Sequence, residues 1–146
     1  MTLALLSQAV LGQSQPAPPV FTNCHPGPTQ QIGTIFSVNP YPLCTGLNVC
    51  MTAQGSLVVP ITAGGQLAIR GFYLGRSVYV DNQDLCTVLA LSGYPCPVPY
   101  TFTSVTMCVR VKSIPLNMAL RMQFSAVNGD GGVIFCQTSM LTAKVC

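Results

Sequence analysis

The segment from Leu120 to Val127, LRMQFSAV, alternates apolar and polar residues without a break. One face of an extended chain would carry Leu120, Met122, Phe124 and Ala126, and the other Arg121, Gln123 and Ser125. A period of two is typical of a strand with one buried face. The segment TSVTMCVRVK (103–112) repeats the pattern, with an apolar face of Val105, Met107, Val109 and Val111. Both segments are therefore predicted to be strands.

Four further segments read as strands: 32–38, 56–61, 66–74 and 132–143. Pro60 moves the second of these toward a sheet edge. NGDGG (128–132) predicts a hairpin, and AGG (63–65) predicts another. Twelve prolines and 13 glycines divide the chain into short pieces, and no segment has a sustained helical period. The pattern predicts an all-β fold, an antiparallel sandwich of two sheets.

The segment DLCTVLALSGYPCPVP (84–99) places an apolar run between Cys86 and Cys96. Three closely spaced prolines at its end argue against a long helix, because proline removes a backbone donor. We expect a cross-linked loop that leads into a strand, with one or two helical turns within 85–93.

Charged residues make up only 6% of the chain, against 49% hydrophobic residues, and the net charge is +3. The six Lys and Arg residues are scattered, which does not favour nucleic-acid binding. Among acid–base groups the chain has one histidine, three aspartates and no glutamate. His25 fits a solvated loop, and Asp130 fits the hairpin turn. Asp81 and Asp84 could form a carboxylate pair or a calcium site, but turn chemistry is favoured. We therefore expect no enzyme, no metal and no cofactor.

Eight cysteines without a CxxC pair indicate disulfides formed in an oxidising compartment. The apolar run LALLSQAVLG (3–12), followed by QSQPAPP, is typical of a secretory signal peptide, although it could be an N-terminal strand or helix. We expect residues 1–15 to be a signal peptide or its remnant and residues 16–146 to be the mature domain, located outside the cell or in a vacuolar or lysosomal lumen.

Four features together resemble a known family: VFTNC (20–24), the pair Cys44 and Cys50, DLC…CPVP (84–99) and VNGDGGVIFCQTSMLTA (127–143). The chain is similar over residues 20–143 to the ML (MD-2-related lipid-recognition) domain. This family includes Niemann-Pick type C2 sterol carriers, group 2 mite allergens and fungal phosphatidylglycerol/phosphatidylinositol transfer proteins, and the motifs look closest to the fungal proteins.

The resemblance implies an immunoglobulin-like sandwich with an apolar cavity between its sheets, which holds a phospholipid or a sterol. It also implies disulfides Cys24–Cys136, Cys44–Cys50 and Cys86–Cys96. Cys108 and Cys146 are additional to the family pattern; we expect them to pair, with free thiols or an intermolecular bridge as the alternatives.

On this reading the apolar faces described above line the lipid site, and two loops, 72–80 and 93–102, surround its mouth. The mouth candidates are Tyr73, Tyr79, Val80, Tyr94, Val98, Tyr100 and Phe102, with Arg76 as a possible phosphate ligand. The residues expected to line the interior are Met107, Val109, Val111, Leu120, Met122 and Phe124. We expect a monomer that contacts membranes transiently. The alternative is a secreted structural or recognition sandwich with a closed core.

Overall fold

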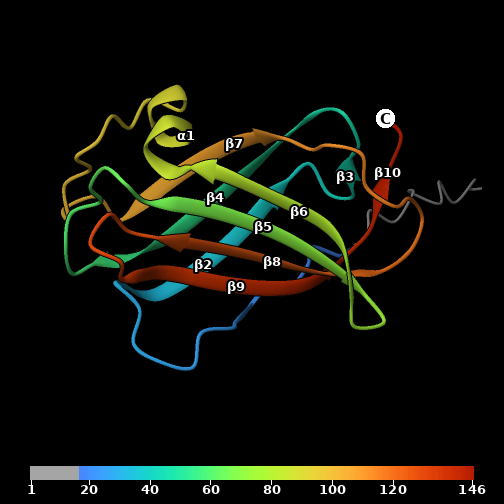
Figure 1. Ribbon diagram of the computed structural model, residues 1–146, viewed down its shortest axis with the longest axis horizontal. Coiled ribbons are helices and arrows are strands. Elements are labelled where there is room, and N and C mark those ends of the chain that lie inside the picture. Colours follow the sequence, from blue (N-terminus) through green and yellow to red (C-terminus); the bar gives the residue numbers. More distant parts are fainter. Residues whose placement is uncertain (1–16) are drawn as a thin grey trace, which may run out of the picture.

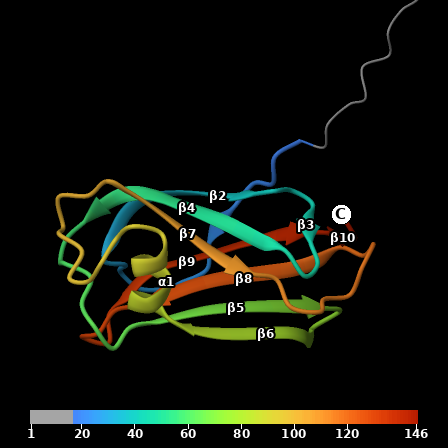
Figure 2. The ribbon, with the colours of Figure 1, turned by 90° about the horizontal axis from the view of Figure 1, so that it is seen from above.

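Two antiparallel sheets pack face to face in the computed structural model, which describes residues 17–146 (Figures 1 and 2). The larger sheet has the order β1-β9-β8-β5-β6 and the smaller one β2-β4-β7. A short parallel pair, β3 and β10, lies at one end of the sandwich, and the single helix of the described residues lies at the other end. The predicted all-β sandwich is confirmed. The expected signal peptide, residues 1–15, lies outside the described residues.

The larger sheet consists of Thr22–Asn23 (β1), Val133–Leu141 (β9), Leu120–Val127 (β8), Gln66–Tyr73 (β5) and Arg76–Asp84 (β6). The smaller sheet consists of Gln31–Asn39 (β2), Asn48–Leu57 (β4) and Ser104–Arg110 (β7). The end pair is Leu43–Cys44 (β3) with Ala143–Lys144 (β10), and the helix is Leu85–Leu91 (α1).

The predicted alternation on β7 and β8 is present in the burial of their side chains. Met107 on β7 is 1% exposed, as are Met122 and Phe124 on β8. The intervening Arg110 and Arg121 are exposed. The apolar faces of the two sheets therefore meet and form one core.

The segment 56–61 is not the strand that was predicted. β4 ends at Leu57, and Ile61 makes only an isolated bridge with Val98. The AGG turn at 63–65 does not form a hairpin either, because β4 and β5 belong to different sheets. It is part of a crossover, whereas the turn at 128–132 does join the paired strands β8 and β9.

Helix α1 forms within 85–93, where one or two turns were expected. Asp84 caps its N-terminus, because its carboxylate accepts hydrogen bonds from Thr87 Oγ1 at 2.7 Å and Thr87 N at 2.9 Å. Its buried residues Leu85, Val88 and Leu89 close one end of the core. At seven residues the helix is far too short to cross a bilayer, and no helix in 17–146 is long and apolar enough to do so.

Two of the expected disulfides are confirmed. Cys24 pairs with Cys136, with Cα atoms 5.1 Å apart, beside the β1–β9 pairing. Cys86 on α1 pairs with Cys96, with Cα atoms 5.7 Å apart, and ties the helix to the proline-rich loop that follows it.

The expected pairs Cys44–Cys50 and Cys108–Cys146 are wrong. Cys50 lies directly opposite Cys108 in the β4–β7 register, with Cα atoms 4.0 Å apart, and these two are bonded. Cys44 on β3 is aligned with Lys144 on β10, so that the chain end brings Cys146 to Cys44. Strand pairing, which spacing along the chain does not reveal, decides both bonds.

Candidate functional site

The space between the two sheets is apolar, and side chains fill it. Two small cavities remain, each about 10 Å³, which is at most room for one water molecule. The first, near α1, is lined by residues that include Leu57, Leu89, Val105 and Met107. The second, toward β3, is lined by residues that include Tyr79, Val109, Val111, Met122 and Phe124. A lipid chain would have to displace these side chains.

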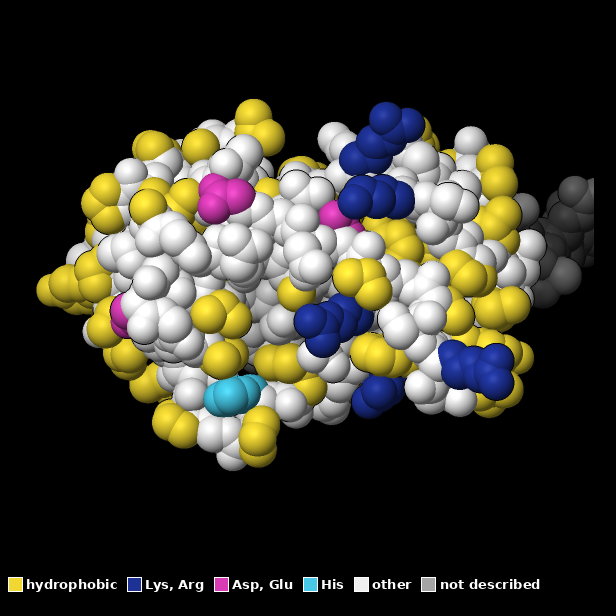
Figure 3. All heavy atoms as spheres, in the orientation of Figure 1, with side chains coloured by type: hydrophobic (Ala, Val, Ile, Leu, Met, Phe, Trp, Pro, Cys, Tyr) yellow, Lys and Arg dark blue, Asp and Glu magenta, His cyan; other side chains and the backbone are white. Residues whose placement is uncertain are grey.

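The larger sheet ends at β6 and the smaller sheet ends at β7 (Figure 2). A surface groove runs along the edge between these two strands. Its two sections, of about 540 and 550 Å³, share Gln83 and Arg110. The first section continues to α1 and the second to Lys112. Figure 3 shows the hollow at the upper edge of the molecule, with Lys or Arg side chains on one side of it. Volumes of this size are typical of ligand sites.

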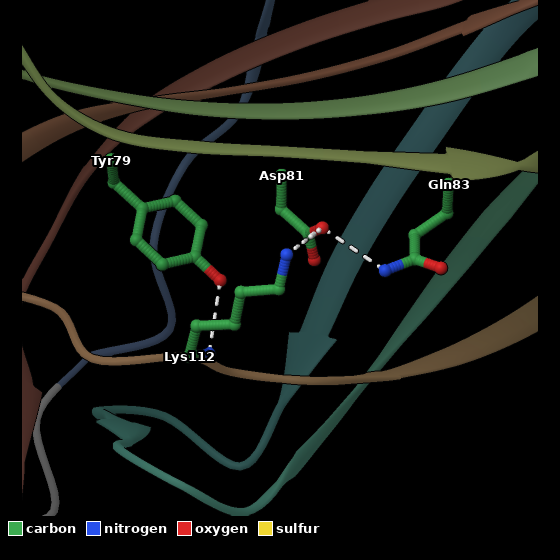
Figure 4. Close-up of polar contacts among 4 residues, drawn as sticks. All are labelled: Tyr79, Asp81, Gln83 and Lys112. Atoms are coloured by element: carbon green, nitrogen blue, oxygen red, sulfur yellow. Dashed lines mark hydrogen bonds and ion pairs between the residues drawn. The ribbon is translucent and has the colours of Figure 1, made fainter.

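Only a thin wall separates this outer groove from the second inner cavity. Val111 borders both, and Val109 borders the cavity and the α1 section of the groove. Every second side chain of β6 points toward the space between β6 and β7. Of these side chains, Tyr79 borders the inner cavity and Gln83 borders the groove. Asp81 lies between them (Figure 4).

Tyr79, Asp81 and Lys112 bridge this edge, Gln83 contacts Asp81 from the same strand, and we call the contacts of these four residues the edge bridge (Figure 4). Tyr79 Oη accepts a hydrogen bond from Lys112 N at 3.2 Å. Lys112 Nζ lies 3.0 Å from Asp81 Oδ1, which also accepts a hydrogen bond from Gln83 Nε2 at 3.0 Å. Burial raises the pKa of Tyr79 above its ordinary value, so its hydroxyl stays neutral at physiological pH. No strand pairing joins β6 to β7.

The opposite edge is joined through the backbone. Gln30 N donates to Val133 O at 2.8 Å, which links the start of β2 to β9 through the backbone. Of the four disulfides, Cys24–Cys136 lies beside the larger sheet, Cys50–Cys108 lies within the smaller sheet, and Cys86–Cys96 holds α1. Cys44–Cys146 joins the β3 and β10 end. No disulfide spans the gap between β6 and β7, and the contacts of the edge bridge all involve side chains.

The structure brings together most of the residues expected inside. Met107 borders the first inner cavity, while Val109, Val111, Met122 and Phe124 border the second. Tyr79, which was expected at the mouth, also borders the second cavity. Leu120 is also buried, at 1% exposure.

The two loops expected to form one mouth lie at opposite ends of the sandwich (Figure 1). Tyr73 and Arg76 face each other in the β5–β6 hairpin, and Val80 is exposed on the outer side of β6. Tyr94, Val98, Tyr100 and Phe102 lie in the segment that follows α1. Of these four, Tyr94 borders the groove and Val98 is fully buried. A single mouth built from both loops is therefore wrong.

Arg76 is not among the residues that line the groove, so the structure offers no support for its role as a phosphate ligand there. The cations at the groove are Arg110 and Lys112. Sequence reasoning missed both of them as site residues, and it missed Asp81 and Gln83. The period-two pattern on 103–112 placed Arg110 and Lys112 on one face, but nothing in the sequence placed β6 beside that face.

The remaining titratable groups have local structural roles. Asp84 caps α1, while Asp81 points into the fold, so the two do not form a carboxylate pair. Asp130 accepts a hydrogen bond from Gly132 N at 2.8 Å within the β8–β9 turn. His25 lies in a loop beside Cys24. Within 17–146, no three His, Cys, Asp or Glu residues gather in a way that could hold a metal ion.

Comparison with known proteins agrees with this architecture. A crystal structure of a Niemann-Pick type C2 protein from Japanese carpenter ant matches with a TM-score of 0.62 and 16% identity, over 86% of this chain and 99% of that one. Chicken MD-1, solved complexed with lipid IVa, matches with a TM-score of 0.54 and 15% identity, over 84% of this chain and 87% of that one. A search of curated protein sequences finds no match. The family model of the ML domain matches residues 20–143, and the chain therefore belongs to the ML domain family.

Proposed function

We propose that the protein binds one lipid, a phospholipid or a sterol, between its two sheets and carries it between membranes, without catalysing a reaction. The observation that carries this proposal is the β6–β7 edge. There a groove of lipid-site dimensions lies next to an apolar interior, and side chains alone separate the two. A similar sandwich, chicken MD-1, was solved with a lipid.

Opening this edge requires few contacts to break. The hydrogen bond between Tyr79 and Lys112 and the ion pair between Lys112 and Asp81 would separate, while both sheets keep their internal pairing. The hydrogen bond from Cys108 N on β7 to Ser92 Oγ at the end of α1, at 3.3 Å, would also break if α1 moves with β6. The backbone contact of Gln30 with Val133 would remain as the hinge on the far edge. An entering acyl chain would then replace the lost packing, at about 0.8 kcal/mol for each buried methylene.

The composition of the core suits such an exchange. Met51, Met107 and Met122 are each at most 1% exposed and face the interior from three strands of the two sheets. Methionine is unbranched and repacks readily around ligands of different shape. The three side chains can therefore move aside without backbone rearrangement.

The end of the sandwich near α1 supplies a surface for membrane contact. Leu91, Tyr100 and Phe102 are 83%, 60% and 44% exposed there. Tyr94 packs against Phe102, with ring centroids 6.0 Å apart, and borders the groove together with Leu91. This exposed apolar patch is thus continuous with the groove, and insertion into the membrane surface would bring the groove to the lipid.

The finer parts of the proposal follow from disulfide content and family membership. Four disulfides suit an oxidising compartment, so we propose that the protein acts outside the cell or in a vacuolar or lysosomal lumen. We also propose that it works as a monomer, with a phospholipid such as phosphatidylglycerol or phosphatidylinositol, or a sterol, as its cargo.

One observation favours a second function. The inner cavities are too small for any lipid, which is what a recognition or structural module with a permanently closed core would show. Such a module would use its outer surface against a partner protein or a cell wall, and its interior would never exchange.

Native mass spectrometry separates the two functions. The protein would be incubated with vesicles that contain phospholipids and sterol, isolated, and analysed with identification of any bound molecule. One lipid per chain is expected for the carrier. A protein that stays empty after incubation with both lipid classes would overturn the proposal and leave the closed module. A Leu91→Asp variant should retain binding from detergent solution but load slowly from vesicles.

A further inference from the structure

The carboxylate of Asp81 has one oxygen that no group in residues 17–146 satisfies. Its side chain is fully buried, with Oδ1 paired to Lys112 Nζ and to Gln83 Nε2. Oδ2 is buried and accepts no hydrogen bond from the described residues. An ionised carboxylate has about four acceptor sites, and leaving one oxygen buried and unpaired is costly.

The position of this oxygen relates it to the proposed lipid site. Asp81 occupies the inward-facing position of β6 between Tyr79, which borders the inner cavity, and Gln83, which borders the groove. A lipid that entered through the β6–β7 edge would therefore have the boundary between its polar head group and its apolar part next to Asp81. The surrounding apolar residues would strengthen any hydrogen bond formed there.

From these observations we propose that Asp81 Oδ2 is an acceptor site for a hydroxyl group of the bound lipid, which makes Asp81 a specificity residue. The inference rests on the proposed function. The chemistry selects a neutral donor, because Lys112 already balances the charge of the carboxylate. A sterol hydroxyl and a hydroxyl of a polyol head group both meet this requirement, whereas a ketone, an ether or a choline head group offers no donor.

The test compares lipids that differ only in the donor. Binding constants are measured for cholestanol against cholestanone, and for phosphatidylglycerol against phosphatidylmethanol, which has the same charge but no hydroxyl. A hydrogen bond to a charged acceptor should favour the hydroxyl member of at least one pair about tenfold or more. The pair that discriminates identifies the source of the hydroxyl.

Asp81→Asn tests the residue itself. Oδ1 of the asparagine should keep its contacts with Lys112 and Gln83, which places a donor where Oδ2 was, so the preference should vanish or reverse toward the ketone. Asp84→Asn, on the same strand but exposed, is the matched control and should keep the preference of the native chain.

A spectroscopic measurement covers the case in which Asp81→Asn does not fold. The chain has only three aspartates, so labelling the aspartate carboxyl carbons gives three NMR signals, which Asp84→Asn and Asp130→Asn assign by elimination. The Asp81 signal should shift with cholestanol or phosphatidylglycerol and less with the matched lipid. Equal binding of both members of each pair, or a preference retained in Asp81→Asn, would overturn this inference and leave lipid binding intact. A native chain that binds none of the four lipids would overturn the proposed function and this inference with it.

Discussion

Lys112 Nζ lies 3.0 Å from Asp81 Oδ1 and thereby connects the segment after β7 to β6 across the open edge of the sandwich. The two ends of this ion pair differ in environment, because the Lys112 side chain is 62% exposed and that of Asp81 is fully buried. When the pair separates, the Lys112 ammonium returns to solvent, whereas the Asp81 carboxylate stays buried. The edge is therefore held by a contact that opens from one side.

Replacing Lys112 by methionine should lower the free energy of unfolding by about 1–3 kcal/mol, because it leaves the Asp81 carboxylate buried without its cation. Urea denaturation measures the change. Lys144→Met is the control and should have almost no effect, since the Lys144 side chain is exposed and forms no ion pair in 17–146. Equal stability of the Lys112 variant and the native chain would mean that the ion pair between Lys112 and Asp81 contributes nothing to stability.

Removing the Tyr79 hydroxyl should loosen the same edge without breaking the ion pair. In Tyr79→Phe the hydrogen bond from Lys112 N is lost, at a cost of about 0.5–1.5 kcal/mol, while the ring still fills the core. Uptake of a fluorescent lipid from vesicles should become faster, which stopped-flow fluorescence measures. Tyr73→Phe, in the exposed hairpin, should load at the native rate. A slower or unchanged rate in the Tyr79 variant would argue against entry at this edge.

The Asp84 cap of α1 should make the stability of the fold depend on pH in the acidic range. Hydrogen bonds from the Thr87 hydroxyl and from Thr87 N lower the pKa of Asp84 below its ordinary value. Because the folded pKa is below the unfolded one, the contribution of this carboxylate is complete above about pH 4 and is lost as the pH falls through the folded pKa. Asp84→Asn keeps a capping side chain but does not titrate. The difference in Tm between the native chain and Asp84→Asn should therefore shrink between about pH 6 and pH 2.

The pKa of Asp130 is also below its ordinary value, because its carboxylate accepts a hydrogen bond from Gly132 N. Its contribution to stability is therefore also lost at acidic pH. The Asp84 variant should thus retain part of the acid sensitivity of the native chain. A Tm difference that stays constant over this pH range would show that Asp84 does not titrate differently in the folded and unfolded chains.

The disulfide pairing can be tested by digestion alone. Trypsin cleaves after Lys and Arg, which leaves Cys50 in the fragment that ends at Arg70 and Cys108 in fragment 77–110. The observed pairing joins these two fragments through Cys50–Cys108 and releases them together under non-reducing conditions. Pairing of Cys44 with Cys50 and of Cys108 with Cys146 would leave fragment 77–110 attached only to residues 145–146. Mass spectrometry of the unreduced digest distinguishes the two results.

The sequence predicts the sandwich well where apolar residues alternate toward the core. β8 and β7 carry a regular inward face of large apolar side chains, so period and burial agree. The same reasoning does not identify β6, because polar residues occupy inward positions and apolar residues occupy outward positions. Asp81 and Gln83 face inward, while Val78 and Val80 face solvent at 36% and 53% exposure. A hydrophobic pattern cannot reveal a strand whose inward face is polar.

The candidate site is less predictable for a related reason. Its wall combines β6, the last strand of one sheet, with β7, the last strand of the other, and their proximity depends on the stacking of the two sheets. Val109 and Val111 could be assigned to an interior face from local alternation, but the contact of Lys112 with Asp81 could not. For the same reason the family resemblance implied Cys44–Cys50, whereas the β4–β7 register determines Cys50–Cys108.

Quenching of tryptophan fluorescence can test directly whether a lipid chain lies between the sheets. The chain contains no tryptophan, so Phe124→Trp places a single reporter beside the second inner cavity, and Tyr73→Trp places a control in the exposed hairpin. Each variant, with its fold verified by thermal unfolding, is mixed with lipid brominated on its acyl chain, which quenches tryptophan on contact. Strong quenching is expected in Phe124→Trp and little in Tyr73→Trp. Lipid bound in stoichiometric amount that leaves the Phe124→Trp emission unchanged would contradict lipid binding between the sheets.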